Sequence, residues 1–264
     1  MLTAIQDCPV SQKLVYEHPL NERIRTFLRL EHLFAKAEHF LGGEDPWETR
    51  AAIEALLEIV TVTARADVKN ELLRELDRHS AALNRIRRQA GVHVDTLDQI
   101  LAELGEAVAA LHALDGQVGQ RARDDGLLKA VAQRTAIPGG TCSFDLPLYH
   151  SWLAQPGAVR GEWLAAWMED MRPASEAIGL ILTLTRTSAS PRPETAPLGF
   201  FQESLDSQLP AQMIRVGLEA QEGLFPEISG HKNRYSIRFM EVVDGAKPVQ
   251  SRDDVAFSLT CCLF

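Results

Sequence analysis

The spacing of hydrophobic residues changes once along this chain, near Ser190, and this change limits the folds that it can adopt. Between Pro19 and about Ser188, apolar residues recur at the intervals of helices that bury one face. Beyond Ser190, apolar and polar residues alternate within 235–240 and 255–261, which is typical of half-buried strands. The sequence therefore predicts an α+β fold, in which an N-terminal antiparallel helical bundle is followed by a small antiparallel β domain.

Helix start and stop signals divide the first part of the chain. Pro19 can occupy a first helical turn, Asp45 can cap a helix whose first residue is Pro46, and Gly91 can end one. The expected helices are 19–42, a helix from 46, then 67–90, 95–113, 125–135, 161–169 and 173–188. The run SPRPETAP, with its prolines, is expected to be a linker. Weaker strand patterns lie at 199–202 and 213–218. The expected organisation is a flexible leader over 1–13, a helical domain over 14–190 and a β domain over 191–264.

Composition and charge restrict the class of function. The chain has 264 residues and a formal net charge of −9, so its surface as a whole does not attract nucleic acid. The longest weakly charged run, 177–185, is about half of what a bilayer span needs. We therefore expect a cytoplasmic protein that binds neither nucleic acid nor membrane.

The four cysteines are Cys8, Cys142, Cys261 and Cys262. Cys261 and Cys262 are adjacent, and adjacent residues of a strand do not easily form a disulfide. No pair has the spacing of a zinc site. The sequence thus predicts reduced, mostly buried thiols, with no metal site and no cofactor.

A basic stripe follows the first expected helix. Arg25, Arg29, His32 and Lys36 are spaced so that they share one face. A solvated helix face explains such a stripe, since Glu22, Glu31 and Glu38 lie nearby. A binding surface for an anionic partner is the alternative explanation, which the residues by themselves favour less than a solvated face.

A second basic set lies on an expected strand. On this strand the apolar residues occupy alternate positions. The basic residues between them therefore point away from the core; they are Lys232, Arg234 and Arg238. This face suits a ligand that carries carboxylates, although charged side chains also protect edge strands from aggregation. Arg65 and Arg134 could extend either basic set.

Three blocks of the sequence resemble one known family. They are Tyr16–Arg29 (YEHPLNERIRTFLR), Ile137–His150 (IPGGTCSFDLPLYH) and Phe225–Phe239 (FPEISGHKNRYSIRF). In this order and spacing they resemble the ZapD family of bacterial cell-division proteins, over about Leu14 to Cys262. The resemblance implies a helical domain that carries a dimer contact, and a curved sheet. We also expect residues 141–144, within 139–148, to add a strand to that sheet.

The resemblance also implies a function. Members of the family are non-enzymatic adaptors that bind the C-terminal tail of the tubulin-like protein FtsZ and cross-link its filaments into bundles, which promotes assembly of the division ring at mid-cell. The expected partners are the FtsZ tail and a second copy of the chain. The expected contact residues are Arg25, Arg29, Arg65, Arg134, His150, Lys232, Arg234 and Arg238.

One alternative is an enzyme. Cys142, Asp145 and His150 lie close in sequence, and a thiol hydrolase needs a thiolate activated by a histidine that a carboxylate orients. No cysteine-hydrolase signature surrounds them, and a structural thiol beside Phe144 explains the cysteine. Rapid alkylation at neutral pH would distinguish the two. A nucleic-acid module, the other alternative, is disfavoured by the net charge and by the lack of exposed aromatics on a basic strand.

Overall fold

The computed structural model of the chain describes residues 13–65, 67–87, 93–206, 211–220, 223–231, 234–242, 245 and 247–263. These residues form two compact units. The β unit contains the described residues up to Arg25 and those from Leu184 onward, and the helical unit is Thr26–Thr183. The division falls inside the first helix and inside the last one. The leader predicted over 1–13 lies outside the described residues apart from Lys13, which is in a strand.

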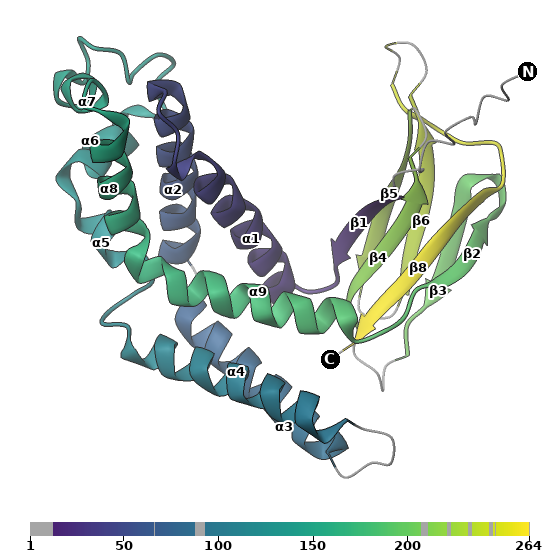
Figure 1. Cartoon of the computed structure of the whole chain (residues 1–264). Coiled ribbons are helices and arrows are strands. Elements are labelled where there is room, and N and C mark those ends of the chain that lie inside the picture. Colours follow the sequence, from purple (N-terminus) through teal and green to yellow (C-terminus); the bar gives the residue numbers. More distant parts are fainter. Residues whose placement is uncertain are drawn as a thin grey trace, which may run out of the picture. The chain divides into compact units, whose positions relative to one another are not determined.

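The helical unit is built of helices joined by connecting loops (Figure 1). Two of its predicted helix starts are confirmed: Asp45 Oδ1 accepts a hydrogen bond from the Trp47 N–H at 2.6 Å, and Asp125 Oδ1 accepts one from the Leu128 N–H at 2.9 Å. The helices are α1 (Glu22–Leu41), α2 (Pro46–Arg65), α3 (Val68–Ile86), α4 (Val94–Ala113), α5 (Gln120–Asp124), α6 (Gly126–Arg134), α7 (Pro147–Leu153), α8 (Gly157–Met168), η1 (Glu169–Met171) and α9 (Arg172–Thr187).

The β unit contains two antiparallel sheets rather than one. The first has the strand order β1-β4-β8-β2, and the second has the order β3-β6-β5, with β7 pairing to β6. Both sheets contribute to one hydrophobic core, which includes Val216 and Leu259 of the first and Ile237 and Phe239 of the second. The strands are β1 (Lys13–Pro19), β2 (Arg192–Ala196), β3 (Phe200–Ser204), β4 (Ala211–Glu219), β5 (Leu224–His231), β6 (Arg234–Glu241), β7 (Val249–Gln250) and β8 (Val255–Leu263). A short helical turn, η2 (Pro197–Gly199), precedes β3.

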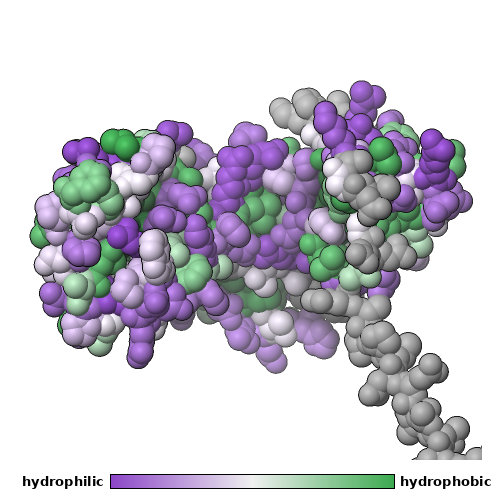
Figure 2. Space-filling view, turned by 90° about the horizontal axis from the view of Figure 1, so that it is seen from above, coloured by the Kyte–Doolittle hydropathy of each residue, from purple (hydrophilic) through white to green (hydrophobic). Residues whose placement is uncertain are grey.

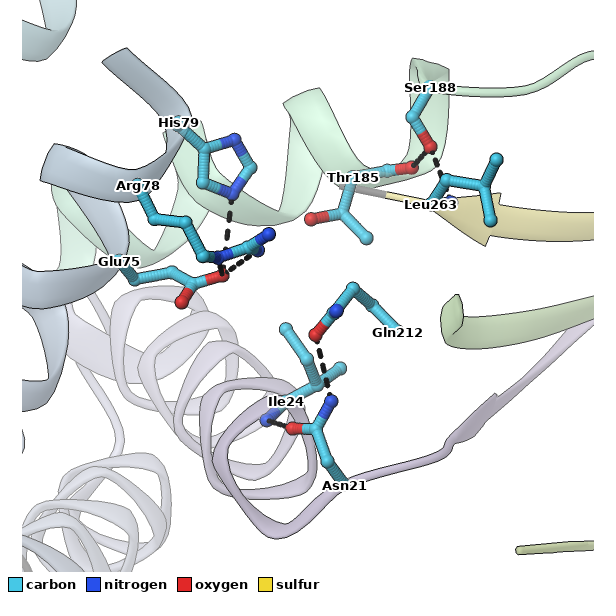
Figure 3. A network of polar contacts seen from close by, with 9 residues as sticks. All are labelled: Asn21, Ile24, Glu75, Arg78, His79, Thr185, Ser188, Gln212 and Leu263. Carbon is cyan, nitrogen blue, oxygen red and sulfur yellow. Dashed lines mark hydrogen bonds and ion pairs between the residues drawn. The ribbon is translucent and has the colours of Figure 1, made fainter. Parts of the chain in front are cut away.

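Two expectations near prolines are wrong. Pro19 ends strand β1, and the helix begins at Glu22 because the Asn21 side chain caps it. Asn21 Oδ1 accepts from the Ile24 N–H at 2.9 Å, and its amide donates to Gln212 Oε1 at 2.8 Å (Figure 3). The expected linker SPRPETAP contains strand β2. Its prolines are tolerated because β2 lies at the edge of its sheet.

The strand expected at 141–144 does not form; residues 139–145 make successive turns. The Gly140 N–H donates to the Ile137 carbonyl at 2.8 Å, and the Cys142 N–H donates to the Gly139 carbonyl at 3.1 Å. Gly139 has a φ of +71°, and a Cβ on Gly140 would lie 2.6 Å from the Arg134 carbonyl oxygen. The two glycines therefore close the turn, and the local hydrogen bonds leave these backbone groups unavailable to a sheet.

A half-buried carboxylate ties three elements of the β unit together. Glu17, on β1, accepts hydrogen bonds from Arg186 Nε and Nη2, both at 2.8 Å, and from Arg215 Nε on β4 at 2.9 Å. Burial alone would raise the pKa of Glu17, but the hydrogen bonds and charges of Arg186 and Arg215 outweigh it and hold that pKa below its usual value.

Replacing Glu17 with glutamine is expected to lower the free energy of unfolding at pH 7 by about 2–3 kcal/mol, because charge-assisted hydrogen bonds are lost. Since the folded pKa is depressed, the stabilisation is complete above the ordinary value of 4.5 and is lost as the pH falls through the folded pKa. Urea titrations followed by circular dichroism should therefore show a wild-type–variant difference that shrinks between pH 7 and pH 3. Glu227→Gln, which removes the exposed partner of Arg238, is the control and should change stability by less than about 1 kcal/mol. An equal Glu17 effect at both pH values would contradict this account.

Candidate partner-binding surfaces

Two of the four residues of the basic stripe on α1 are exposed, and the other two, Arg25 and Lys36, are half-buried. Arg29 and His32 are exposed, while Phe27 and Leu30 on the opposite face are 1% and 0% exposed. Lys36, further along the stripe, forms an ion pair of 3.6 Å with Glu58 of α2. The solvated-face explanation thus applies to Lys36, which has a carboxylate partner.

Helical geometry relates Arg29 to Arg65. Helices α1 and α2 run in opposite directions from the short connection that joins them (Figure 1). Arg29 lies about two turns before Lys36, and Arg65 lies about two turns after Glu58. Arg29 therefore lies on the same face of α1 as Lys36, and Arg65 lies on the same face of α2 as Glu58. Both are exposed, and within the described residues neither has a carboxylate at ion-pair distance.

Arg134 and His150 lie around the 139–145 turns. Arg134 ends α6, and its Nη1 is 3.6 Å from Asp145 Oδ1. His150 is exposed on α7. Because the Arg134 side chain is 44% exposed, water screens this ion pair, and the arginine remains accessible to a partner.

Sequence reasoning missed Arg50, which organises the same region. Its Nη1 donates to Thr141 Oγ1 at 3.1 Å, and its guanidinium lies 4.9 Å from the Tyr149 ring centre and 5.2 Å from that of Trp47. These are cation–π distances. Burial, which the Arg50 charge only partly offsets, raises the pKa of Tyr149 to about 12. No local pattern marks Arg50, because its partner Thr141 comes from a distant part of the chain.

On the β unit, Arg234 and Arg238 share the outer face of β6. Both are exposed, whereas Tyr235, Ile237 and Phe239 are buried in the core, so the predicted parity is confirmed for these two arginines. Lys232 lies outside the described residues. Arg238 Nη2 is 3.4 Å from Glu227 Oε2 on β5, and Arg234 has no carboxylate partner among the residues that are described.

Arg25 belongs to the β unit and pairs with Glu22 at 3.1 Å. Burial, followed by the charge of Arg25, lowers the pKa of His18, so His18 is mostly neutral at pH 7. The His18 ring approaches Gly230 of β5, where a Cβ would lie 3.3 Å from its Nε2. The β unit thus places His18 beside β5 and within reach of the charge of Arg25.

The proposed thiol site is not assembled. Cys142 is half-buried, and its Sγ lies 3.5 Å from Asp145 Oδ2. His150 is exposed, and no hydrogen bond joins it to Cys142 in the described structure. Cys261 and Cys262 are also free thiols, and burial raises the pKa of both, that of Cys262 to about 11.

Two other classes of site, a metal centre and a membrane-spanning helix, are not found among the described residues. In the part of the chain that is described, no group of three histidine, cysteine, aspartate or glutamate side chains is placed to hold a metal ion. None of its helices is long and apolar enough to cross a bilayer. The space-filling view shows hydrophilic residues interspersed with hydrophobic ones rather than one uniform face (Figure 2).

The fold and these surfaces define an α+β protein with a helical unit and a β unit, each of which exposes arginines. Residues 28–238 match the family described as ZapD, cell division protein. A cell division protein ZapD from Methylococcus capsulatus is 44% identical over 256 residues, which cover 96% of this chain and 100% of that protein. The ZapD proteins of Azoarcus sp. and Chromobacterium violaceum are 39% and 38% identical, over 94% of this chain and 98% and 99% of their own lengths. The chain therefore belongs to the ZapD family of cell-division proteins.

Proposed function

We propose that this chain is a non-enzymatic adaptor of bacterial cell division, which binds the C-terminal tail of FtsZ and cross-links FtsZ filaments at the mid-cell ring. The full-length similarity to proteins named cell division protein ZapD carries the proposal. Exposed arginines support it, because guanidinium groups bind peptide carboxylates with two parallel hydrogen bonds.

The contact residues of the proposal fall on both units. On the helical unit they are Arg29, Arg65, Arg134 and His150. On the β unit they are Arg25, Lys232, Arg234 and Arg238. Arg29, Arg65 and Arg234 are the best supported, because each is exposed and none has a carboxylate partner within the described residues. An anionic partner would supply the missing counter-charge.

Cross-linking requires at least two tail sites in one particle, which a homodimer of this chain would provide. Two linked sites bind two filaments far more tightly than one site binds one filament, because the second contact forms at a high effective concentration. Modest affinity at each site is then sufficient for bundling.

Co-sedimentation with FtsZ polymers tests the function. The chain is expected to pellet with full-length FtsZ and to remain in the supernatant with FtsZ that lacks its C-terminal tail. Pelleting should decrease as salt rises from about 0.05 to 0.3 M, because exposed charges are screened over a shorter length. Pelleting that does not require the tail would contradict the tail site, and no pelleting with either polymer would contradict the partner.

A further inference from the structure

The two sheets of the β unit meet along a seam between strands that do not pair with each other. Strand β1 lies beside β5, but in the described part of the chain β1 pairs with β4 and β5 pairs with β6. Both are edge strands, so side chains close the space between them. Gly230 of β5 marks the closest approach: a Cβ there would lie 2.5 Å from Leu20 Cδ2 and 3.3 Å from Nε2 and Cδ2 of His18. His18 thus closes the seam by packing against the backbone of a glycine.

The His18 ring points between the two sheets. Because side chains alternate along a strand, His18 shares a face of β1 with Tyr16, which packs against the hydrophobic core, and Glu17 faces the other way. Its partner in register on β4 is Ile214, which is 0% exposed. A half-buried histidine therefore stands at the rim of an apolar core, and histidine is the side chain whose charge changes near neutral pH.

The surroundings of the ring oppose its protonation. Burial, followed by the positive charge of Arg25 on α1, lowers the pKa of His18. Glu22, the carboxylate partner of Arg25, is exposed and lies 3.1 Å from that guanidinium. On the facing sheet, Tyr235 donates its hydroxyl hydrogen to Glu203. Within the described residues no carboxylate lies at ion-pair distance from His18, so none stabilises a proton on it.

We propose that His18 is an acid-sensitive latch between the two sheets. With a neutral imidazole the seam is closed. An imidazolium must reach water, because a charge buried without a partner is costly, and its movement separates β5 from β1. Strand β5 is then held by β6 alone, and a strand with fewer contacts opens locally more often. The β5–β6 hairpin carries Arg234, so acidity controls how firmly this arginine is held. The latch lies within the β unit and does not depend on the identity of the partner.

Proton linkage gives the sign and the size of the effect. The closed state has a lowered His18 pKa, and an open state with a solvated ring has the ordinary value of 6.5. As the pH falls below 6.5, the open state binds the proton more readily, so opening is favoured and the closed state loses stability. Between pH 7.5 and pH 5.5, a histidine that titrates only in the open state raises the population of that state at most about tenfold.

Amide hydrogen exchange of the full chain, read by mass spectrometry and corrected for the intrinsic rate at each pH, measures the opening. Between pH 7.5 and pH 5.5 the exchange of β5 is expected to rise by up to about tenfold, while that of α2 in the helical unit is unchanged. His18→Gln keeps a neutral polar side chain, so it should keep the protection at pH 7.5 and remove the rise. His112→Gln, at an exposed position on α4, is the matched control and should show the rise of the wild type. The His18 imidazole, followed by NMR, should titrate with a midpoint below 6.5.

Gly230→Ala is a second variant, because its methyl group would occupy the space of Leu20 and of the His18 ring. It should raise the exchange of β5 already at pH 7.5, since the seam cannot close. A rise at pH 5.5 that persists in His18→Gln, or that extends equally to α2, would overturn the latch. Wild-type exchange of β5 that is the same at both pH values would also overturn it, as would a Gly230→Ala variant that exchanges as the wild type does.

Discussion

Reversing one charge, by Arg29→Glu on the helical unit or Arg234→Glu on the β unit, is expected to abolish the bundling of FtsZ filaments. Each arginine is exposed and lacks a carboxylate partner in the described residues, so its replacement disrupts no ion pair that the fold needs. The introduced carboxylate repels the carboxylates of the ligand. We expect the Kd for the tail peptide to rise at least about tenfold, which corresponds to about 1.4 kcal/mol. Because bundling depends on two contacts, it should fall further than single-site affinity.

Light scattering and co-sedimentation measure the bundling, and the fluorescence anisotropy of a labelled FtsZ tail peptide measures its Kd at a single site. Arg74→Glu on α3 and Arg252→Glu between β7 and β8 are matched controls, since both residues are exposed arginines that the proposal does not use. Circular dichroism should show that all four variants keep their fold. Undiminished bundling by both Arg29→Glu and Arg234→Glu would rule out this assignment of the site.

Arg160→Met is expected to cause the largest loss of stability, about 3–5 kcal/mol. Arg160 is 3% exposed and has no acidic partner among the described residues. Its Nε donates to Thr49 Oγ1 at 2.9 Å, its Nη1 donates to the carbonyls of Leu153 at 3.0 Å and of Gln155, and its Nη2 donates to the Glu44 carbonyl. The guanidinium therefore closes the C-terminal end of α7 onto the start of α2. Methionine fills similar space but leaves several buried acceptors unpaired.

Tryptophan fluorescence during urea unfolding measures this effect. All four tryptophans lie in the helical unit, so the signal reports on the unit that contains Arg160. Arg121→Met is the control: its side chain is 54% exposed and contacts Glu169, and its loss should change stability by less than about 1 kcal/mol. Arg160→Lys should lie between the wild type and Arg160→Met, because lysine keeps the charge but cannot reach all four acceptors from one plane. Equal stability of the Arg160→Met and Arg121→Met variants would refute a structural role for the buried guanidinium.

Arg29 and Arg160 differ in how the sequence presents them. Arg29 follows a helical spacing, so its exposed face can be predicted from the residues on either side. Arg160 has no such signal, because its acceptors are backbone carbonyls, which every residue carries. A sequence that contains many arginines does not show which of them is buried.

The sequence by itself determined the features that depend on neighbouring residues. The change of hydrophobic period predicted the α+β fold, Asp45 and Asp125 predicted helix starts, and the parity of β6 predicted that Arg234 and Arg238 face outward. Each of these follows from side-chain directions repeated over a few residues or from capping by a local side chain.

Only the tertiary structure decided the features that join distant segments. Strand β1 pairs with β4, Lys13 opposite Glu219, and Glu17 meets Arg186 and Arg215 only because that pairing forms. The segment that was expected to be a linker contains β2, which is possible because β2 lies at the edge of its sheet. Turns occupy 139–145, where a strand was expected. Arg50 and Arg160 likewise obtain their partners from remote parts of the chain. Such contacts form only where packing of the whole unit outweighs the entropy of closing long loops, and no local pattern records that balance.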